Sequence, residues 1–221
     1  MNKSDIAKLI DHTLLRPDAA VSEINRLCEE ALEFGFHSVC VNPFFIPAAK
    51  DVLSGSSVKV TTVVGFPLGM TLSRVKVYEA IEAALNGCDE IDFVMNLGMA
   101  KEGRWDLVAT DISDVISSTR GIVHKVIIET CFLNVDEKIR ASQMVREAGA
   151  EFVKTSTGFG RGGATVEDIR LIKSAVENNC GVKASGGIRT LDQVIRLIEA
   201  GAARIGTSAS VEIINEYGQS V

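Results

Sequence analysis

Short apolar segments alternate with longer amphipathic segments from one end of the chain to the other. The apolar segments predict eight strands, at residues 9–13, 38–42, 58–64, 90–95, 123–129, 152–155, 182–184 and 203–206. Apolar residues at helical spacing predict helices at residues 4–10, 18–34, 45–53, 73–85, 102–118, 134–148, 165–177, 190–200 and 210–216. Strands and helices therefore alternate along one continuous chain, with a short extra helix at the N-terminus.

This alternation indicates right-handed βαβ units and a parallel sheet that is buried on both faces. The continuous apolar run Val126-Ile-Ile128 agrees with a strand buried on both sides. Eight such units close into a (β/α)8 TIM barrel, which would occupy residues 1–221 as a single domain. The competing architecture is an open doubly wound sheet, but it usually has a glycine-rich turn after its first strand. Here Leu14-Leu-Arg-Pro17 follows the first strand and contains no glycine.

The composition is that of an ordinary globular protein, with 46% hydrophobic and 24% charged residues among 221. A net charge of -6 argues against binding to nucleic acid or to an anionic membrane, although a small anionic substrate is still compatible with it. The N-terminus has no apolar signal segment, and no apolar run approaches the ~18 residues that span a bilayer. Five scattered cysteines without a CxxC pair indicate reduced thiols and a cytoplasmic protein.

Two similar segments carry the most informative pattern. Glu151-Phe-Val-Lys-Thr-Ser-Thr-Gly158 and Gly181-Val-Lys-Ala-Ser-Gly-Gly187 each place a lysine in or after a short apolar run. If the two runs are neighbouring parallel strands, Lys154 and Lys183 lie side by side. A nearby cation and partial burial would lower the lysine pKa from its usual ~10.4 and make the amine a nucleophile. The spacing alone favours the alternative, two lysines that simply reach water.

Polar residues gather where the predicted strands end, which is where barrel enzymes build their active sites. They include Asp11, Cys40, Asp92, Thr155 and Lys183. Asp92 lies inside the apolar run 91–95, so its carboxylate must be paired or its pKa must rise. A lysine across the barrel mouth would pair with it and form a proton-transfer relay. A structural salt bridge between layers of the barrel is the alternative.

Glycines after the last three strands predict a phosphate site, because glycine lets backbone N–H groups approach phosphate oxygens. Gly158 follows the sixth strand, Gly186 and Gly187 the seventh, and Gly206 precedes Ser208 after the eighth. Tight turns are the alternative explanation for these glycines. Arg189 could either bind the phosphate or cap the following helix.

The chain shows no metal-binding pattern and no cofactor motif. His12, His37 and His124 do not have metal-ligand spacing, a Walker sequence is missing, and no GxGxxG sequence follows the first predicted strand. An amine nucleophile, a second lysine, a carboxylate and a phosphate site without metal or cofactor fit one reaction class best. That class is Schiff-base cleavage or formation of a carbon–carbon bond in a phosphorylated sugar.

Six motifs, in order along the barrel, resemble those of the deoxyribose-phosphate aldolase family. They are Asp11-His-Thr-Leu-Leu15, Val39-Cys-Val-Asn-Pro43, Glu90-Ile-Asp-Phe-Val94, Lys154-Thr-Ser-Thr-Gly-Phe159, Val182-Lys-Ala-Ser-Gly-Gly-Ile-Arg189 and Gly206-Thr-Ser208. The two lysine motifs are specific, whereas Gly-Gly-Ile-Arg alone occurs in many phosphate-binding barrels.

The resemblance implies a metal-free class I aldolase of deoxynucleoside breakdown. Its small-molecule substrates would be 2-deoxy-D-ribose 5-phosphate, D-glyceraldehyde 3-phosphate and acetaldehyde. It implies that Lys154 forms the imine, that Lys183 keeps this amine unprotonated, and that Asp92 shuttles protons with a water. Asp11 and Cys40 match positions that line the site. The resemblance leaves a homodimer open, because dimers are common in the family.

Two departures from the family pattern stand out. Some members use a C-terminal tyrosine in proton transfer, but Tyr217 is followed here only by a short tail at residues 218–221, and no role is assigned to it. Some members carry a lysine where this chain has Phe159, so the phosphate would depend more on backbone amides. Two other functions stay open: another phosphate-binding barrel lyase or isomerase, and a non-catalytic barrel that binds a sugar phosphate.

Overall fold

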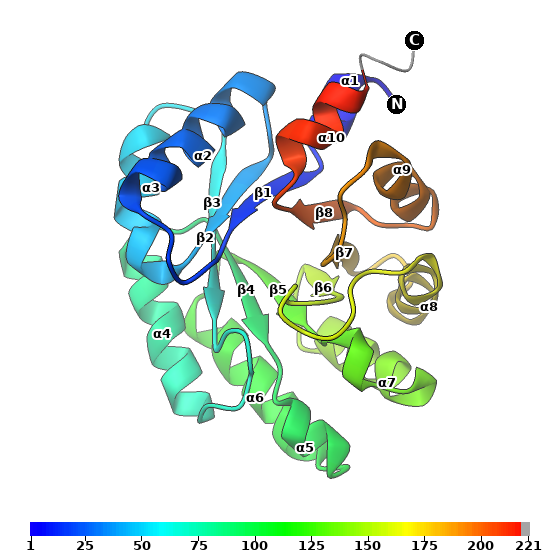
Figure 1. Ribbon diagram of the computed structural model, residues 1–221. Coiled ribbons are helices and arrows are strands. Elements are labelled where there is room, and N and C mark those ends of the chain that lie inside the picture. The colour runs from blue at the N-terminus through cyan, green and yellow to red at the C-terminus, as the bar shows by residue number, and fades with distance from the viewer. Residues whose placement is uncertain (218–221) are drawn as a thin grey trace.

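The computed structural model, which describes residues 1–217, is a closed barrel of eight parallel strands in chain order. The predicted TIM barrel is therefore confirmed. Figure 1 shows the strands around a common centre with the helices outside them. The strands are β1 (Ile10–Leu14), β2 (Ser38–Val41), β3 (Lys59–Val64), β4 (Glu90–Val94), β5 (Val123–Ile127), β6 (Phe152–Lys154), β7 (Gly181–Ser185) and β8 (Arg204–Thr207).

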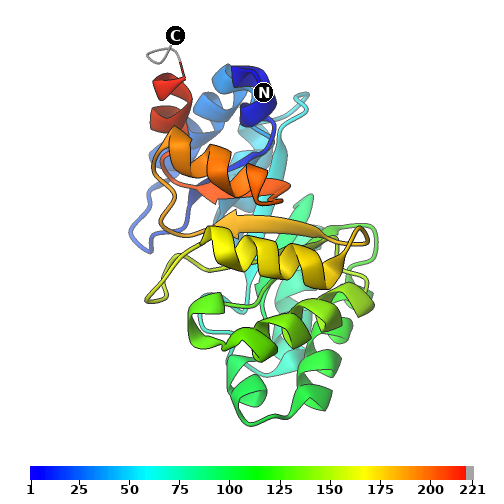
Figure 2. The same ribbon diagram turned by 90° about the vertical axis from the view of Figure 1, so that its right-hand side faces the viewer.

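The helices connect successive strands and cover the outside of the barrel. In Figure 2, α7, α8 and α9 lie one above another along one side of it. The helices are α2 (Val21–Phe34), α3 (Ile46–Val52), α4 (Ser73–Leu85), α5 (Leu97–Lys101), α6 (Trp105–Ser118), α7 (Val135–Glu147), α8 (Val166–Val176), α9 (Leu191–Glu199) and α10 (Ser210–Glu216), with short 3-10 turns η1 (Pro43–Phe45) and η2 (Thr130–Phe132). The extra N-terminal helix α1 (Lys3–Ala7) lies beside α10, as Figure 1 shows.

Local sequence signals mark several helix ends. The side chains of Asn134, Thr165 and Thr190 accept hydrogen bonds from backbone N–H groups in the first turns of α7, α8 and α9, as N-cap residues do. Gly35 ends α2 in the left-handed conformation, with φ 68°. Helix α1 begins one residue before the expected residue 4, capped by the Asn2 side chain, which accepts from the N–H of Asp5, and it ends at Ala7 rather than at residue 10.

The expected helix at 102–118 also differs from the structure. A separate short helix, α5, precedes α6, and Gly103 lies between them with φ 72°. This backbone conformation is strained for residues with a side chain, so the helix cannot continue through it. The last helix, α10, has the bounds that the hydrophobic pattern predicts, and the tail at residues 218–221 lies outside the described residues.

The hydrophobic core lies between the strands and the surrounding helices. Buried residues such as Ile91, Phe93 and Val126 belong to it. Because side chains alternate across a strand, the residues between them point to the barrel interior. Asp92 and Lys125 are among these inward-facing residues, and both are fully buried. The interior of this barrel is therefore occupied largely by charged groups.

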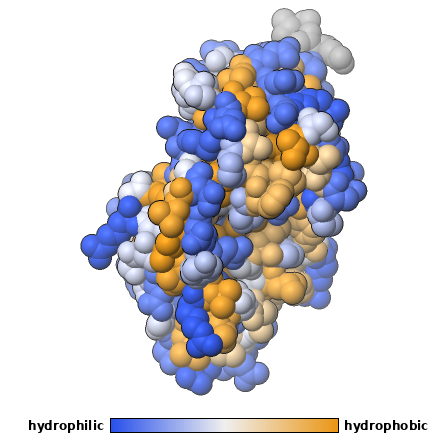
Figure 3. Space-filling model, turned by 90° about the vertical axis from the view of Figure 1, so that its left-hand side faces the viewer, coloured by the Kyte–Doolittle hydropathy of each residue, from blue (hydrophilic) through white to orange (hydrophobic). Residues whose placement is uncertain are grey.

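One outer face of the barrel exposes many apolar side chains. We call this set the α4 stripe: it comprises apolar residues on the exposed face of α4 and on the loop before it, namely Leu68, Met70, Leu72, Val75, Tyr78 and Leu85. In Figure 3, hydrophobic side chains gather on the lower part of this face, where α4 lies. Among the residues described, no helix combines the length and the apolar character needed to cross a membrane.

Candidate active site

Seven ionisable side chains converge inside the barrel, and none of these residues is more than 8% exposed. They come from six of the eight strands. They are Asp11 of β1, Glu90 and Asp92 of β4, Lys125 of β5, Lys154 of β6, Lys183 of β7 and Arg204 of β8. We call them the charge cluster. Buried charges are tolerated only when they are paired and hydrogen-bonded, so their mutual contacts determine their state.

Lys154 and Lys183 lie side by side, as the repeated segment predicts. They are register partners on the adjacent strands β6 and β7. Their Nζ atoms contact the same oxygen, Oδ2 of Asp92, at 2.7 Å and 2.6 Å respectively. The two amines therefore share one carboxylate and stand within each other's electrostatic reach.

Asp92 has three lysine partners rather than the single one that the sequence suggests. Lys125 donates to its other oxygen, Oδ1, at 2.7 Å. Burial alone would raise the pKa of Asp92, but the charges of Lys125, Lys154 and Lys183 together hold it well below its usual range. The carboxylate is therefore ionised in the free protein and is the central anion of the cluster.

A second layer of contacts supports these groups from below. Lys183 donates to Asp11, and Lys125 lies 2.6 Å from Oε2 of Glu90. Arg204 bridges the two acids, at 2.9 Å from Asp11 and 3.2 Å from Glu90. The same surroundings hold the pKa of Glu90 at about 2: burial would raise it, but Lys125, the hydrogen bond from His37 and Arg204 lower it.

The cluster contains one positive charge more than negative charges if every group is ionised. Its three carboxylates face four cations, counted among the described residues 1–217. The pKa of Lys154 is lowered, chiefly by burial and further by Lys183, although Asp92 opposes the shift. For Lys183 and Lys125, burial is outweighed by the neighbouring carboxylates, and their pKa values are raised. Lys154 is thus the cation that most readily gives up its proton.

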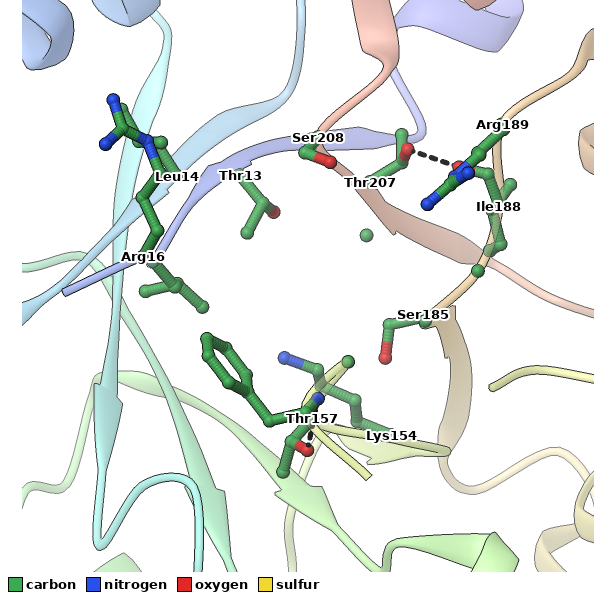
Figure 4. Close-up of a pocket in the computed structure, with 16 residues that line it drawn as sticks. Thr13, Leu14, Arg16, Lys154, Thr157, Ser185, Ile188, Arg189, Thr207 and Ser208 are labelled. Carbon is green, nitrogen blue, oxygen red and sulfur yellow. Dashed lines mark hydrogen bonds between the residues drawn. The ribbon is translucent and has the colours of Figure 1, made fainter. Parts of the chain in front are cut away.

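A cavity of about 310 Å³ opens above the cluster at the carboxyl ends of the strands. Of the seven clustered side chains, Lys154 alone lines it, within the part of the chain that the structure describes. Figure 4 shows Lys154 and Thr157 on one side of this space, with Thr13 and Ser208 on the opposite side. The amine with the lowered pKa is therefore the one that a bound molecule can reach.

Five predicted phosphate-site residues line the cavity: Gly158, Gly186, Gly187, Gly206 and Ser208. The amides of Gly158, Gly186, Gly187 and Ser208 donate to no other group within residues 1–217, so they are available to an anion. A side chain at Gly206 would come within 3.0 Å of Cε of Lys183, so Lys183 would have to shift to make room for it. The glycines thus serve both the cavity and the charge cluster.

Arg189 also lines the cavity, and Figure 4 shows it on the same side as Ser208. The N-cap of the following helix is Thr190, whose hydroxyl accepts from the N–H of Gln193. The backbone N–H of Arg189 donates to the Gln193 side chain at 2.8 Å. The guanidinium group is therefore not needed as a cap, which favours a role in anion binding.

Three residues predicted to line the substrate site do not line the cavity. Asp11 is the second residue of β1 rather than its last, so it lies in the lower layer with Lys183 and Arg204. Cys40 is fully buried, and burial followed by the charge of Asp92 raises the pKa of its thiol to about 11. The Thr155 hydroxyl is bonded to the backbone of Ser185 in both directions, at 3.1 Å.

Lys125, Glu90 and Arg204 were missed by the sequence analysis. Each is a charged residue inside a predicted strand and lies close to a residue that was recognised. Glu90 is two residues before Asp92, and Arg204 is the register partner of Lys183. Lys125, for example, is the register partner of Asp92. The signal that could have found them is the one used for Asp92: a charged residue within an apolar strand must have a partner.

Among the described residues, one group of side chains approaches metal-binding geometry at the other end of the barrel. Ligand atoms of Asp11, His37 and Glu90 lie within 4.8 Å of one another. Arg204 and Lys125 already occupy the oxygens of both acids. This donor set does not fit a metal ion, because a cation would have to displace two positive side chains.

The fold and the site together define a barrel enzyme whose cavity joins a lysine amine of lowered pKa to a set of free backbone amides. Comparison with known proteins gives the family. The family described as DeoC/LacD family aldolase matches residues 6–213. The deoxyribose-phosphate aldolase of Thermoanaerobacter sp. (strain X514) is 54% identical over 218 residues, covering 97% of this chain and 98% of that protein.

Two solved structures agree with this assignment. The aldolase QR15 superposes with a TM-score of 0.93 at 44% identity, covering 97% of this chain and 96% of that one. The tetrameric deoxyribose phosphate aldolase from Aeropyrum pernix gives a TM-score of 0.92 at 32% identity, covering 100% and 94%. The chain therefore belongs to the DeoC/LacD family of aldolases.

Proposed function

We propose that this chain is a deoxyribose-phosphate aldolase that works through a Schiff base on Lys154. It cleaves 2-deoxy-D-ribose 5-phosphate reversibly into D-glyceraldehyde 3-phosphate and acetaldehyde, the reaction that the family resemblance implies; the 54% identical relative is named deoxyribose-phosphate aldolase. The observation that carries the proposal is the position of Lys154. Among the seven clustered side chains it alone both reaches the cavity and has a lowered pKa.

The first step is attack of the Lys154 amine on C1 of the open-chain aldehyde. The amine adds to the carbonyl carbon, and uptake of one proton with loss of water leaves a protonated imine on Nζ; the proton is released again when the last imine is hydrolysed. When Lys154 swings toward the substrate, Oδ2 of Asp92 loses one of its two lysine partners. That oxygen can then accept a hydrogen bond from a water, which agrees with the proton-shuttling role predicted for Asp92.

The second step breaks the bond between C2 and C3 of the sugar. The C3 hydroxyl loses its proton and becomes the aldehyde of glyceraldehyde 3-phosphate. The bonding electrons move toward the imine nitrogen and leave an enamine, which takes up a proton at C2. Addition of water to the resulting imine releases acetaldehyde and restores the amine, so atoms and charges balance.

The free amides at the other side of the cavity would hold the phosphate. Gly186 and Gly187 after β7 and Ser208 after β8 provide N–H donors, and Arg189 adds a positive charge. Phe159 lines the cavity where some relatives carry lysine, and its ring packs edge-on against Phe66 at 5.4 Å. Backbone amides therefore carry more of the phosphate binding in this chain.

Reduction with borohydride in the presence of acetaldehyde tests the proposal directly. The protein should gain the mass of one ethyl group, and peptide mapping should place it on Lys154. The rival barrel lyase or isomerase, in which lysine acts only as an acid, would give no adduct. A non-catalytic sugar-phosphate-binding barrel would bind deoxyribose 5-phosphate without releasing acetaldehyde.

Replacing Lys183 with methionine is expected to move the pH dependence of the reaction upward. Without the Lys183 cation, the carboxylates of the cluster stabilise protonated Lys154 more strongly, so its pKa rises. The free amine is the reactive form, so the rising limb of kcat/KM moves to higher pH. If the Lys154 pKa rises by about one, the rate near neutral pH falls about tenfold, because the fraction of free amine falls in proportion.

The matched control is Lys183→Arg, which keeps the positive charge and should leave the rising limb of kcat/KM near its original pH. Activity of Lys183→Met should recover as the pH is raised. If kcat/KM is lower at every pH and its rising limb does not move, Lys183 only supports the structure.

We further propose a cytoplasmic homo-oligomer in which residues 1–221 act as one barrel domain. The relative from Aeropyrum pernix is a tetramer, and it aligns with the whole of this chain. The α4 stripe is the surface that fits a second copy, because monomeric proteins rarely expose large contiguous apolar patches.

Charges placed on the α4 stripe should separate the subunits. A double variant with Tyr78→Glu and Leu85→Glu is expected to elute as a monomer in size-exclusion chromatography with light scattering. Both side chains are largely exposed, at 65% and 76%, so the barrel itself should remain folded. Val135→Glu, on exposed α7, is the matched control. A double variant with the size of the unmodified protein would exclude this surface.

A further inference from the structure

We propose that Glu129 is a positioning residue for the phosphate end of the cavity and that it acts through Thr157. The proposal rests on the proposed function, because it concerns how the enzyme recognises its phosphorylated substrate. Glu129 follows β5 and is 2% exposed. It takes no part in the charge cluster, and the chemistry proposed for Lys154 does not use it.

The backbone of Glu129 has a conformation that is unusual for a residue with a side chain. Its φ of 49° and ψ of 68° place it in the left-handed region, which residues with side chains rarely occupy. Only Glu129 and Glu177 combine a side chain with a positive φ in the described part of the chain. Such strain persists where the surrounding contacts determine the conformation, and it concentrates at functional sites.

The Glu129 carboxylate binds both donors of a single residue in the loop after β6. It accepts the backbone N–H of Thr157, at 3.3 Å to Oε1 and 3.2 Å to Oε2, and it also accepts the Thr157 hydroxyl. The Thr157 oxygen in turn accepts the N–H of Phe159 at 3.0 Å. The amides on either side of Gly158 are thus occupied, and the Gly158 amide is the one left free in this turn.

The same loop is held from its other end against the second phosphate loop. The N–H of Ala164 donates to the carbonyl of Gly186 at 3.1 Å. A side-chain carbon on Gly163 would lie 2.1 Å from that carbonyl oxygen, so the two loops are in direct backbone contact. A side-chain carbon on Gly160 would come within 3.1 Å of the Glu129 carboxyl group. The loop is therefore enclosed between Glu129 and Gly186.

These contacts give Glu129 a specific effect. Thr157, Gly158 and Phe159 line the cavity, so the carboxylate sets where the loop's free amide points. An ionised carboxylate can accept both Thr157 donors with charge-assisted hydrogen bonds, whereas a glutamine offers one oxygen and adds a competing N–H₂ group. Loss of the charge should therefore loosen the loop without changing the contacts of Lys154.

The test compares two substrates that differ only in the phosphate. In Glu129→Gln, KM for 2-deoxy-D-ribose 5-phosphate should rise about tenfold, the size expected when a charge-assisted hydrogen bond is lost. The kcat/KM for unphosphorylated 2-deoxy-D-ribose should stay within about twofold of its original value, since that substrate does not use the loop. Thr157→Val, which keeps the side-chain shape and removes the hydroxyl, should give the same pattern if Glu129→Gln does not fold.

Glu151→Gln is the matched control, because Glu151 also accepts a backbone N–H, that of His124 at 2.7 Å, but does not line the cavity. It should leave both substrates unaffected. Equal losses on the two substrates, or no change on either, would overturn the proposal. The acetaldehyde adduct on Lys154 in the unmodified protein separates this outcome from failure of the proposed function, since acetaldehyde carries no phosphate.

Discussion

Replacing Lys154 with leucine is expected to abolish both the acetaldehyde adduct and the cleavage of deoxyribose 5-phosphate. The loss of turnover should be at least about 10⁴-fold, because no other amine of the charge cluster lines the cavity and can act as the nucleophile. Release of glyceraldehyde 3-phosphate, measured in a coupled assay, and mass spectrometry of the reduced protein provide the two measurements.

The same variant should fold as well as the unmodified protein. Leucine removes the surplus cation, so three carboxylates then face three cations inside the barrel. A melting temperature that is unchanged or higher would support this account of the cluster. Lys101→Leu is the control, since Lys101 is an exposed lysine paired with Glu137. Near-normal turnover in Lys154→Leu would refute the proposed chemistry.

Replacing Asp92 with asparagine should have the second largest effect, and it should affect stability as well as activity. The change leaves the amines of Lys125, Lys154 and Lys183 converging on a neutral group. Removing one partner of a buried ion pair costs about 3–5 kcal/mol, because the remaining charges are left uncompensated. Turnover should fall by about 10³-fold, since the amine geometry and the proton route both depend on this carboxylate. Urea denaturation and steady-state kinetics measure the two effects.

Asp111→Asn separates the two effects of the Asp92 change. Asp111 forms a buried ion pair with Lys76 at 2.6 Å, but this pair lies between α4 and α6, outside the barrel interior. Asp111→Asn should lower the free energy of unfolding by an amount comparable to that in Asp92→Asn, but it should retain most of the turnover. If both variants lost activity to the same extent, the loss in Asp92→Asn would reflect unfolding and not a role at the site.

The sequence was sufficient for the fold and for the juxtaposition of the two lysines. Strand and helix periods gave the order of the elements, and the repeated segment placed Lys154 beside Lys183. The glycines around the cavity were also predictable, because a backbone requirement can be recognised from residue type alone. Gly158, Gly186, Gly187 and Gly206 were all recognised in this way, and the structure places all four at the cavity.

Depth inside the barrel could not be predicted from the sequence. Which layer a residue occupies depends on the register between strands, and the tilt of the barrel staggers equivalent positions. Asp11 is expected at a strand end but lies in the lower layer, opposite Gly206 in the register of β1 and β8. Thr155 shows the same limit, because it directly follows Lys154 and its hydroxyl bonds to Ser185. Register also hid Lys125 and Arg204, since each is a single charge within an otherwise ordinary strand, and it hid the partners of Glu90, which lies two residues before Asp92 in β4.

The acids and the bases of the charge cluster come from different halves of the chain. Its three acids all come from β1 and β4, and its four bases come from β5, β6, β7 and β8. Each half of the barrel thus presents one sign of charge to its interior, and only the opposite half supplies the counter-ions. Neither half-barrel can neutralise its own inner surface, so the two halves are electrostatic complements, and either half alone would leave its buried charges uncompensated.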